Sequence, residues 1–261
     1  MEGDKLRLKI ELTATENIRL PIHYNHLVQA MIYQSMDREF AEFLHEHGYE
    51  VNKRKFKLFT FSRLLGQYKI LGSEILFSPP INLIIASPLK EFSQYLLNGL
   101  LTLGVIRLGK SELYIKKAVM EAPEAKSKIT IKLLSPVVAY STLLKPEGGK
   151  YTCYFQPGEQ EFVRLAEENL RRKYQAVYKC EPPTGEIQIW CLRPPRLNLI
   201  KYKNFTIKGY SGILKMQGPQ PLLQMAIDAG LGSKNSMGFG CGELINKPEK
   251  NKKNMQPGYK K

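Results

Sequence analysis

Cysteine, acidic side chains and long apolar runs are all scarce in this sequence. The four cysteines are scattered without a CxxC pair, so they have neither a zinc-site spacing nor a disulfide framework, and they fit a reducing cytoplasm. The first residues show no apolar signal core, and no apolar run approaches the roughly 20 residues of a membrane helix. We therefore expect a soluble cytoplasmic protein without a membrane span, a metal site or another cofactor.

Basic residues outnumber acidic ones by 39 to 24, which gives a formal net charge of +15. The excess is uneven: residues 1–119 carry 16 Lys and Arg against 12 Asp and Glu, and the remainder carries 23 against 12. A charge of this size favours a polyanionic partner, because each neutralised phosphate releases counterions. A solvated basic surface is the alternative. The 43% hydrophobic content indicates a folded chain.

Hydrophobic periodicity predicts the same order of elements twice. In each half, alternating runs indicate strands and apolar stripes at helical spacing indicate helices, in the order β-α-β-β-α-β of a ferredoxin-like domain. The first half has strands at 6–12, 58–61, 72–85 (interrupted by Pro79-Pro80) and 112–119, and helices at 26–36, 38–46 and 88–101. The second half has strands at 129–134, 186–190, 205–216 and 240–245, and helices at 159–174 and 219–229.

The predicted fold is therefore α+β, with two tandem ferredoxin-like (RRM-like, βαββαβ) domains. A polar linker near 122–127 separates domain 1–121 from domain 122–245. Residues 246–261 carry six Lys and two Pro, and we expect them to form a basic disordered tail.

A glycine-rich loop, residues 230–242, lies between the last predicted helix and the last strand. It holds five glycines in thirteen residues, which suits tight turns and N–H groups that can bind anions. Nucleotide-binding loops run from strand to helix, so this loop follows neither the dinucleotide nor the P-loop pattern. It is either a structural turn or a phosphate-contacting loop. In the second case Lys234, Asn235 and Ser236 suit phosphate or base-edge contacts.

The four histidines all lie in the first domain. His26 stands at a predicted helix start that Asn25 could cap, and we interpret it as structural. His45 and His47 lie beside the basic segment 53–57. Histidine shuttles protons near neutral pH, and lysine stabilises a dianionic transition state. This pair of residue types therefore suits transesterification at an RNA phosphodiester. The alternative is a histidine that merely faces RNA.

Four stretches of the sequence form a recognisable set: Tyr33 in QAMIY, His45 in FLHE, Lys57 in FKLFTFS and the loop GLGSKNSMGFG. Together they resemble the CRISPR-associated repeat-RNA endoribonucleases of the Cas six family, and the resemblance extends from about 6 to 245. It implies metal-independent cleavage within the repeats of precursor CRISPR RNA by 2′-hydroxyl attack. The products would carry a 2′,3′-cyclic phosphate and a 5′-hydroxyl.

The resemblance also implies roles for individual residues. Tyr33 would be the base or would orient the 2′-hydroxyl, His45 would be the general acid, and Lys57 would be the transition-state cation. His47 is an alternative acid, and Lys53 and Lys55 compete with Lys57. The predicted RNA-binding residues are Gly232, Lys234, Asn235, Ser236 and Gly238, with a basic track of Arg193, Arg196, Lys201 and Lys203.

Repeat RNA is the partner that this interpretation requires, and other CRISPR-associated subunits or a second copy in a homodimer are further candidates. The main rival is a non-catalytic member that binds repeat RNA within a CRISPR surveillance complex. A structural subunit of such a complex would fit the loop and the charge, but it would leave the His–Lys cluster without a role.

Overall fold

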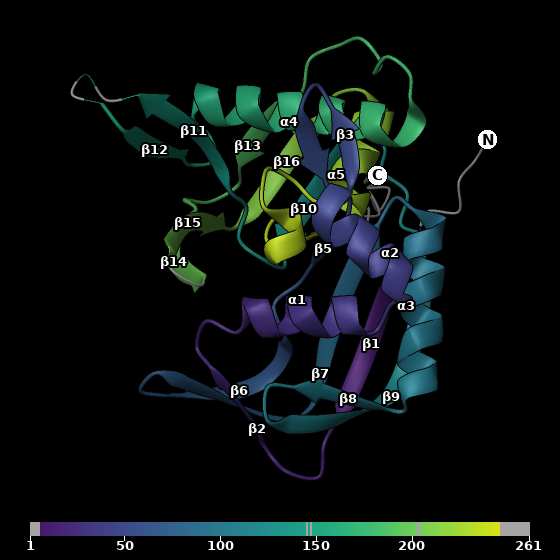
Figure 1. Cartoon of the computed structure of the whole chain (residues 1–261). Helices are drawn as coiled ribbons and strands as arrows, with labels where there is room; N and C mark the ends of the chain where they lie inside the picture. The colour runs from purple at the N-terminus through teal and green to yellow at the C-terminus, as the bar shows by residue number, and fades with distance from the viewer. Residues whose placement is uncertain (1–5, 145, 147, 203–204, 246–261) are drawn as a thin grey trace, which may run out of the picture.

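The computed structural model describes residues 6–144, 146, 148–202 and 205–245, and β1 (Leu6–Thr13) lies at the centre of its first sheet. Strict alternation places Leu8, Ile10 and Leu12 in the core, where α1 (Asn25–Gln34) and α3 (Lys90–Leu103) cover them (Figure 1). Strands β7 (Glu74–Ser87) and β9 (Ser111–Glu121) flank β1 on either side. The sheet order is β2-β7-β1-β9-β8, with β5 and β6 also paired to β7. The remaining elements of this half are β2 (Ile18–Pro21), α2 (Arg38–Glu42), η1 (Phe43–His47), β3 (Tyr49–Val51), β4 (Arg54–Phe56), β5 (Thr60–Phe61), β6 (Leu65–Leu71) and β8 (Val105–Leu108).

Strand β7 runs through Pro79-Pro80, where the sequence predicted an interruption. Its first part pairs with β2 and β6, and its part after the prolines pairs with β1. The irregularity lies at the prolines themselves: Leu65 and Gln67 of β6 are two residues apart, whereas their partners Asn82 and Ser78 in β7 are four apart, so β7 bulges at Pro79-Pro80. Proline has no N–H for the ladder, so it is tolerated where the pairing changes from one neighbour to another.

The second sheet has the order β13-β16-β10-β17. In chain order these are the second, third, first and fourth strands of this sheet, which is the ferredoxin-like order. Its strands are β10 (Lys128–Leu133), β13 (Gln188–Cys191), β16 (Ile213–Gln217) and β17 (Gly242–Leu244). Helices α4 (Gln160–Tyr178) and α5 (Gln220–Asp228) bury their apolar stripes against it. The predicted α+β fold with two ferredoxin-like units is confirmed. The expected boundary at 121/122 falls at the end of β9, and the predicted tail 246–261 lies outside the described residues.

Two hairpins extend from the second unit, β11–β12 (Ala139–Leu144 and Lys150–Phe155) and β14–β15 (Arg196–Tyr202 and Phe205–Ser211). The prediction of a single strand at 205–216 is wrong, because the strand is interrupted at Gly212. Its first part forms β15, which pairs with β14, and its second part forms β16 in the main sheet. Among the described residues, no helix is long and apolar enough to cross a membrane.

The two units are joined by hydrogen bonds as well as by apolar packing. The buried Arg7 guanidinium in β1 donates to the carbonyl of Gly242 in β17. The Arg63 N–H donates to the Leu134 carbonyl at 3.1 Å, and the Ser135 hydroxyl donates to the Phe61 carbonyl at 3.0 Å. The segment after β5 is therefore fixed to the start of the second unit.

Candidate functional site

Tyr33 and His45 line the same pocket, which has a volume of about 500 Å³. The buried face of α1, with Val28, Met31 and Ile32, seats the helix on the sheet and leaves Tyr33 half-buried at its edge. The Tyr33 and His45 rings meet edge to face with centroids 5.8 Å apart. His26, which the sequence suggested was structural, also lines this pocket, together with Tyr202 from β14.

The position of His45 depends on a single π-helical turn, η1. The Gly48 N–H donates to the Phe43 carbonyl at 2.8 Å, which closes the wide turn, and Leu44 is buried beneath it. Gly48 has φ +64°, and a Cβ there would lie 2.6 Å from the carbonyl oxygen of Phe56. Glycine is therefore required for the β3–β4 hairpin to pack this closely on the turn. Wide turns of this kind occur often at functional sites.

Lys57 is the lysine that contacts His45. Its ammonium donates to the His45 carbonyl oxygen at 2.6 Å, whereas Lys55 donates to the Glu46 carbonyl at 3.2 Å. Lys53 is exposed in the hairpin turn. Burial and the neighbouring Lys55 charge lower the pKa of Lys57, and Glu46 opposes them.

The Tyr33 hydroxyl is held in its protonated form. Burial, with a smaller contribution from Tyr202, raises the pKa of Tyr33 well above its usual range. The phenol therefore remains a hydrogen-bond donor at neutral pH. His47 is exposed at the end of η1 and does not line the pocket that Tyr33 and His45 share. The structure thus brings Tyr33, His45 and Lys57 together and leaves His47 outside.

The glycine-rich loop is seated on the first unit and begins where α5 ends. The Asn25 amide donates to the Met237 and Gly238 carbonyls at 2.9 and 3.2 Å, and the Gln29 amide donates to the Ser236 carbonyl at 2.7 Å. The expected capping role of Asn25 is wrong, because Tyr24 is the N-cap of α1 and the Asn25 side chain reaches the loop instead.

Gly238 allows this close contact, since it has φ +84° and a Cβ there would lie 2.5 Å from the Phe61 ring and 2.7 Å from the Asn25 amide nitrogen. The loop also uses many of its N–H groups internally or on neighbours. Those of Ser233, Met237, Gly238 and Gly240 each donate to a backbone carbonyl.

Asn235 and Lys173 form the buried centre of the loop. The Asn235 amide donates to the Leu231 and Phe239 carbonyls, and its oxygen accepts from the Lys173 ammonium at 2.7 Å. Lys173, only 2% exposed, also donates to the Gly230 and Gly232 carbonyls at 2.6 and 3.1 Å. Asn235 therefore holds the loop together from within. In the sequence Lys173 is one of three adjacent basic residues on an amphipathic helix, a pattern typical of a solvated face, so its role was missed.

The other predicted RNA-binding residues are spread over a wider surface. Lys234 and Ser236 are half-buried, and the Lys234 ammonium lies over the Tyr140 and Phe205 rings, 4.9 and 5.4 Å from their centroids. Gly232 and Gly238 are buried. Arg193, Arg196 and Lys201 are exposed on and beside the β14–β15 hairpin and line neither the Tyr33–His45 pocket nor the groove described below. Lys203 lies outside the described residues.

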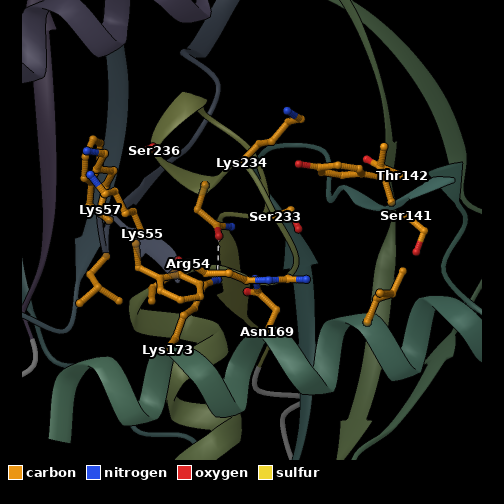
Figure 2. A pocket seen from close by; sticks show the side chains of 17 residues that line it. Arg54, Lys55, Lys57, Ser141, Thr142, Asn169, Lys173, Ser233, Lys234 and Ser236 are labelled. Carbon is orange, nitrogen blue, oxygen red and sulfur yellow. Dashed lines mark hydrogen bonds between the residues drawn. The ribbon is translucent and has the colours of Figure 1, made fainter. Parts of the chain in front are cut away.

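A groove of about 610 Å³ separates the β3–β4 hairpin from the second unit. In Figure 2, Asn169 and Lys173 rise from α4 below, Lys55 and Lys57 lie on one side, Ser141 and Thr142 lie on the other, and Lys234 lies above. Five basic residues line it, and none of the described lining residues is acidic. Lys57 connects this groove to the Tyr33–His45 pocket, because it lines the groove and contacts His45. The arrangement suits an anionic strand that reaches a histidine.

Replacing Lys173 with methionine should lower the free energy of unfolding. The change leaves the Gly230 and Gly232 carbonyls and the Asn235 oxygen without their donor, and each such loss costs about 1–3 kcal/mol. Denaturant titration measures the change. Arg164→Met, on the exposed face of the same helix, should change the unfolding free energy far less.

The wild type and Lys173→Met also test the lowered pKa of Lys173. Burial lowers the pKa of Lys173 to about 7 from 10.5. Between these pH values the unfolded chain carries a proton at this position that the folded chain lacks, so the unfolding free energy rises with pH there. The wild type should show this rise relative to Lys173→Met, and the difference should be level below pH 7. Parallel curves for the two proteins would contradict a buried, titrating Lys173.

Both units match models of one family of proteins. The model of the CRISPR-associated protein Cas6 N-terminal domain matches residues 19–119, and that of the Cas6 C-terminal domain matches residues 119–244. The chain belongs to the Cas6 family. Its relatives include the CRISPR-associated endoribonuclease Cas6 1 of Methanocaldococcus jannaschii, which is 29% identical over 260 residues and 97% of each chain.

Further relatives agree in sequence and in fold. The CRISPR-associated endoribonuclease Cas6 of Pyrococcus furiosus is 25% identical over 235 residues, which cover 85% of this chain and 82% of the relative. A solved CRISPR associated protein Cas6 superposes with a TM-score of 0.77 at 27% identity, over 93% of this chain and all of that one. The resemblance inferred from the sequence is confirmed at the level of the family.

Proposed function

We propose that this protein is a metal-independent endoribonuclease that cleaves precursor CRISPR RNA within its repeats to release guide RNAs. The observation that carries the proposal is the cluster of Tyr33, His45 and Lys57. Tyr33 and His45 share one pocket, and Lys57, which lines the adjoining basic groove, donates to the His45 carbonyl. The names of the relatives, which are CRISPR-associated endoribonucleases, supply the substrate class.

In this mechanism the 2′-oxygen of the RNA attacks the adjacent phosphorus, and the bond from phosphorus to the 5′-oxygen breaks. His45 in its protonated form gives a proton to the leaving 5′-oxygen. Lys57 supplies positive charge beside the crowded dianionic phosphorane, where stabilisation of developing charge contributes most. Tyr33, which stays protonated, orients the 2′-hydroxyl, and the proton of that hydroxyl passes to solvent as the bond from the 2′-oxygen to phosphorus forms.

Cleavage in the presence of a metal chelator tests this function. A synthetic RNA carrying the CRISPR repeat of the source organism should be cut at the same rate with EDTA as without it, because protein side chains carry the chemistry. Mass spectrometry should find a 2′,3′-cyclic phosphate on one product and a 5′-hydroxyl on the other. Mg²⁺-dependent cutting, or a 5′-phosphate product, would refute the mechanism, and binding without cutting would favour the non-catalytic alternative.

A further inference from the structure

We propose that the groove between the two units binds one nucleotide of the RNA, with its base read by Asn169 and its phosphates held by Arg54, Lys55 and Lys234. This subsite rests on the proposed function, since it takes the RNA as its ligand, and it lies beside the Tyr33–His45 pocket. Its volume of about 610 Å³ and its basic lining suit a nucleotide.

Asn169 is the residue that indicates a ligand. It lies on the inward stripe of α4 with Phe162, Ala166 and Leu170, where an apolar side chain would be expected. It is 9% exposed, yet its oxygen Oδ1 accepts no hydrogen bond from any described residue. Buried polar atoms are almost always hydrogen-bonded. This oxygen has almost no accessible surface, so a bound molecule supplies the missing donor once the amide turns its oxygen toward the groove that Asn169 lines.

The chemistry of the amide fits a nucleobase. Asparagine presents an acceptor beside a donor, and each nucleobase has an edge on which a donor lies beside an acceptor. Proteins read unpaired RNA by such contacts to splayed bases. Asn169 lies on the groove floor while the cationic side chains lie around it, so a base can enter the groove while its phosphates stay near the rim (Figure 2).

The groove is continuous with the catalytic cluster through two residues. Lys57 lines the groove and bonds the carbonyl of His45. Phe59 also lines the groove, and its ring packs edge to face on Tyr33 with centroids 5.8 Å apart. A strand that places its scissile phosphate at Lys57 therefore has a neighbouring nucleotide in reach of Asn169.

An abasic scan tests the proposal. The probe is the repeat RNA with a 2′-deoxy substitution at the scissile nucleotide, in a series that lacks one base at a time on either side of that position. For the wild type, removal of one base should weaken binding on the order of 10-fold to 100-fold, the discrimination expected of a paired amide. For Asn169→Ala, removal of that same base should have almost no further effect, while the other positions respond as in the wild type.

Two controls separate base reading from folding. Gln160→Ala removes an exposed amide from the start of the same helix and should keep the wild-type profile. Asn169→Ala should unfold at the same temperature as the wild type or higher, because it removes an unpaired buried oxygen. Asn169→Leu fits the apolar stripe and serves as a second variant with the same expected profile.

The proposal is overturned if no single base matters to the wild type, if Asn169→Ala keeps the wild-type profile, or if it weakens binding equally at every position. These outcomes differ from a failure of the proposed function. A protein that shows the base-specific loss but never cuts unmodified repeat RNA would retain the subsite and lose the endoribonuclease assignment. If the wild type cuts repeat RNA normally but Asn169→Ala gives the wild-type abasic scan, the endoribonuclease assignment stands and the subsite is rejected.

Discussion

Replacing His45 with alanine should lower the single-turnover rate of repeat-RNA cleavage by about 10²–10⁴-fold, the usual contribution of a general acid. The side chain lies on the exposed turn η1, with its ring against Tyr33, so its removal leaves the buried Leu44 and the Lys57 contact with the backbone carbonyl in place. RNA affinity, measured by filter binding, should therefore change little.

His47→Ala is the matched control, because it removes the other imidazole of the same turn from a position outside the pocket. It should cleave at close to the wild-type rate. Normal cleavage by His45→Ala together with loss in His47→Ala would transfer the role of the acid to His47. A loss in His45→Ala that follows a loss of RNA binding would instead make His45 an RNA contact.

A 2′-deoxy substitution at the scissile nucleotide should abolish cleavage. The 2′-oxygen is the nucleophile in the proposed mechanism, and no side chain of the cluster can replace an attacking atom that belongs to the substrate. Denaturing gels of single-turnover reactions measure the product. The substituted RNA should still bind, since the basic side chains that line the groove are suited to phosphates rather than to this hydroxyl.

The control RNA carries the same substitution one nucleotide away on either side, where cleavage should continue. Product formation from the RNA that lacks the scissile 2′-hydroxyl would mean that water attacks the phosphate, and the roles proposed for Tyr33 and His45 would then have to be reassigned.

The central strands and the helices could be predicted from the sequence because their patterns are local. Strict alternation in β1 and the apolar stripes of α3 and α4 record which side faces the core. Strand β6 was not predicted, since it is an exposed strand with six of its seven residues exposed and no alternation in burial. The sequence also did not predict that 205–216 divides into two strands at Gly212, because the residues on both sides of this glycine favour a strand.

The candidate site divides in the same way. Tyr33, His45 and Lys57 could be singled out from residue types and from the family resemblance, and the structure places them together. The contacts of Asn25 with the loop, the burial of Lys173 and the groove around Asn169 join residues tens to hundreds of positions apart. Local periodicity carries no information about such contacts, so only the three-dimensional structure could reveal them.

The hydrogen bonds between the first unit and the glycine-rich loop have one property in common. Asn25, Gln29 and Thr60 all donate to main-chain oxygens of the loop, at Met237, Gly238, Ser236 and Phe239. The side chains of Ser236 and Met237 can therefore be exchanged without removing any of these bonds. Substitutions at these two positions therefore leave the helix that carries Tyr33 bound to the loop through the same main-chain oxygens.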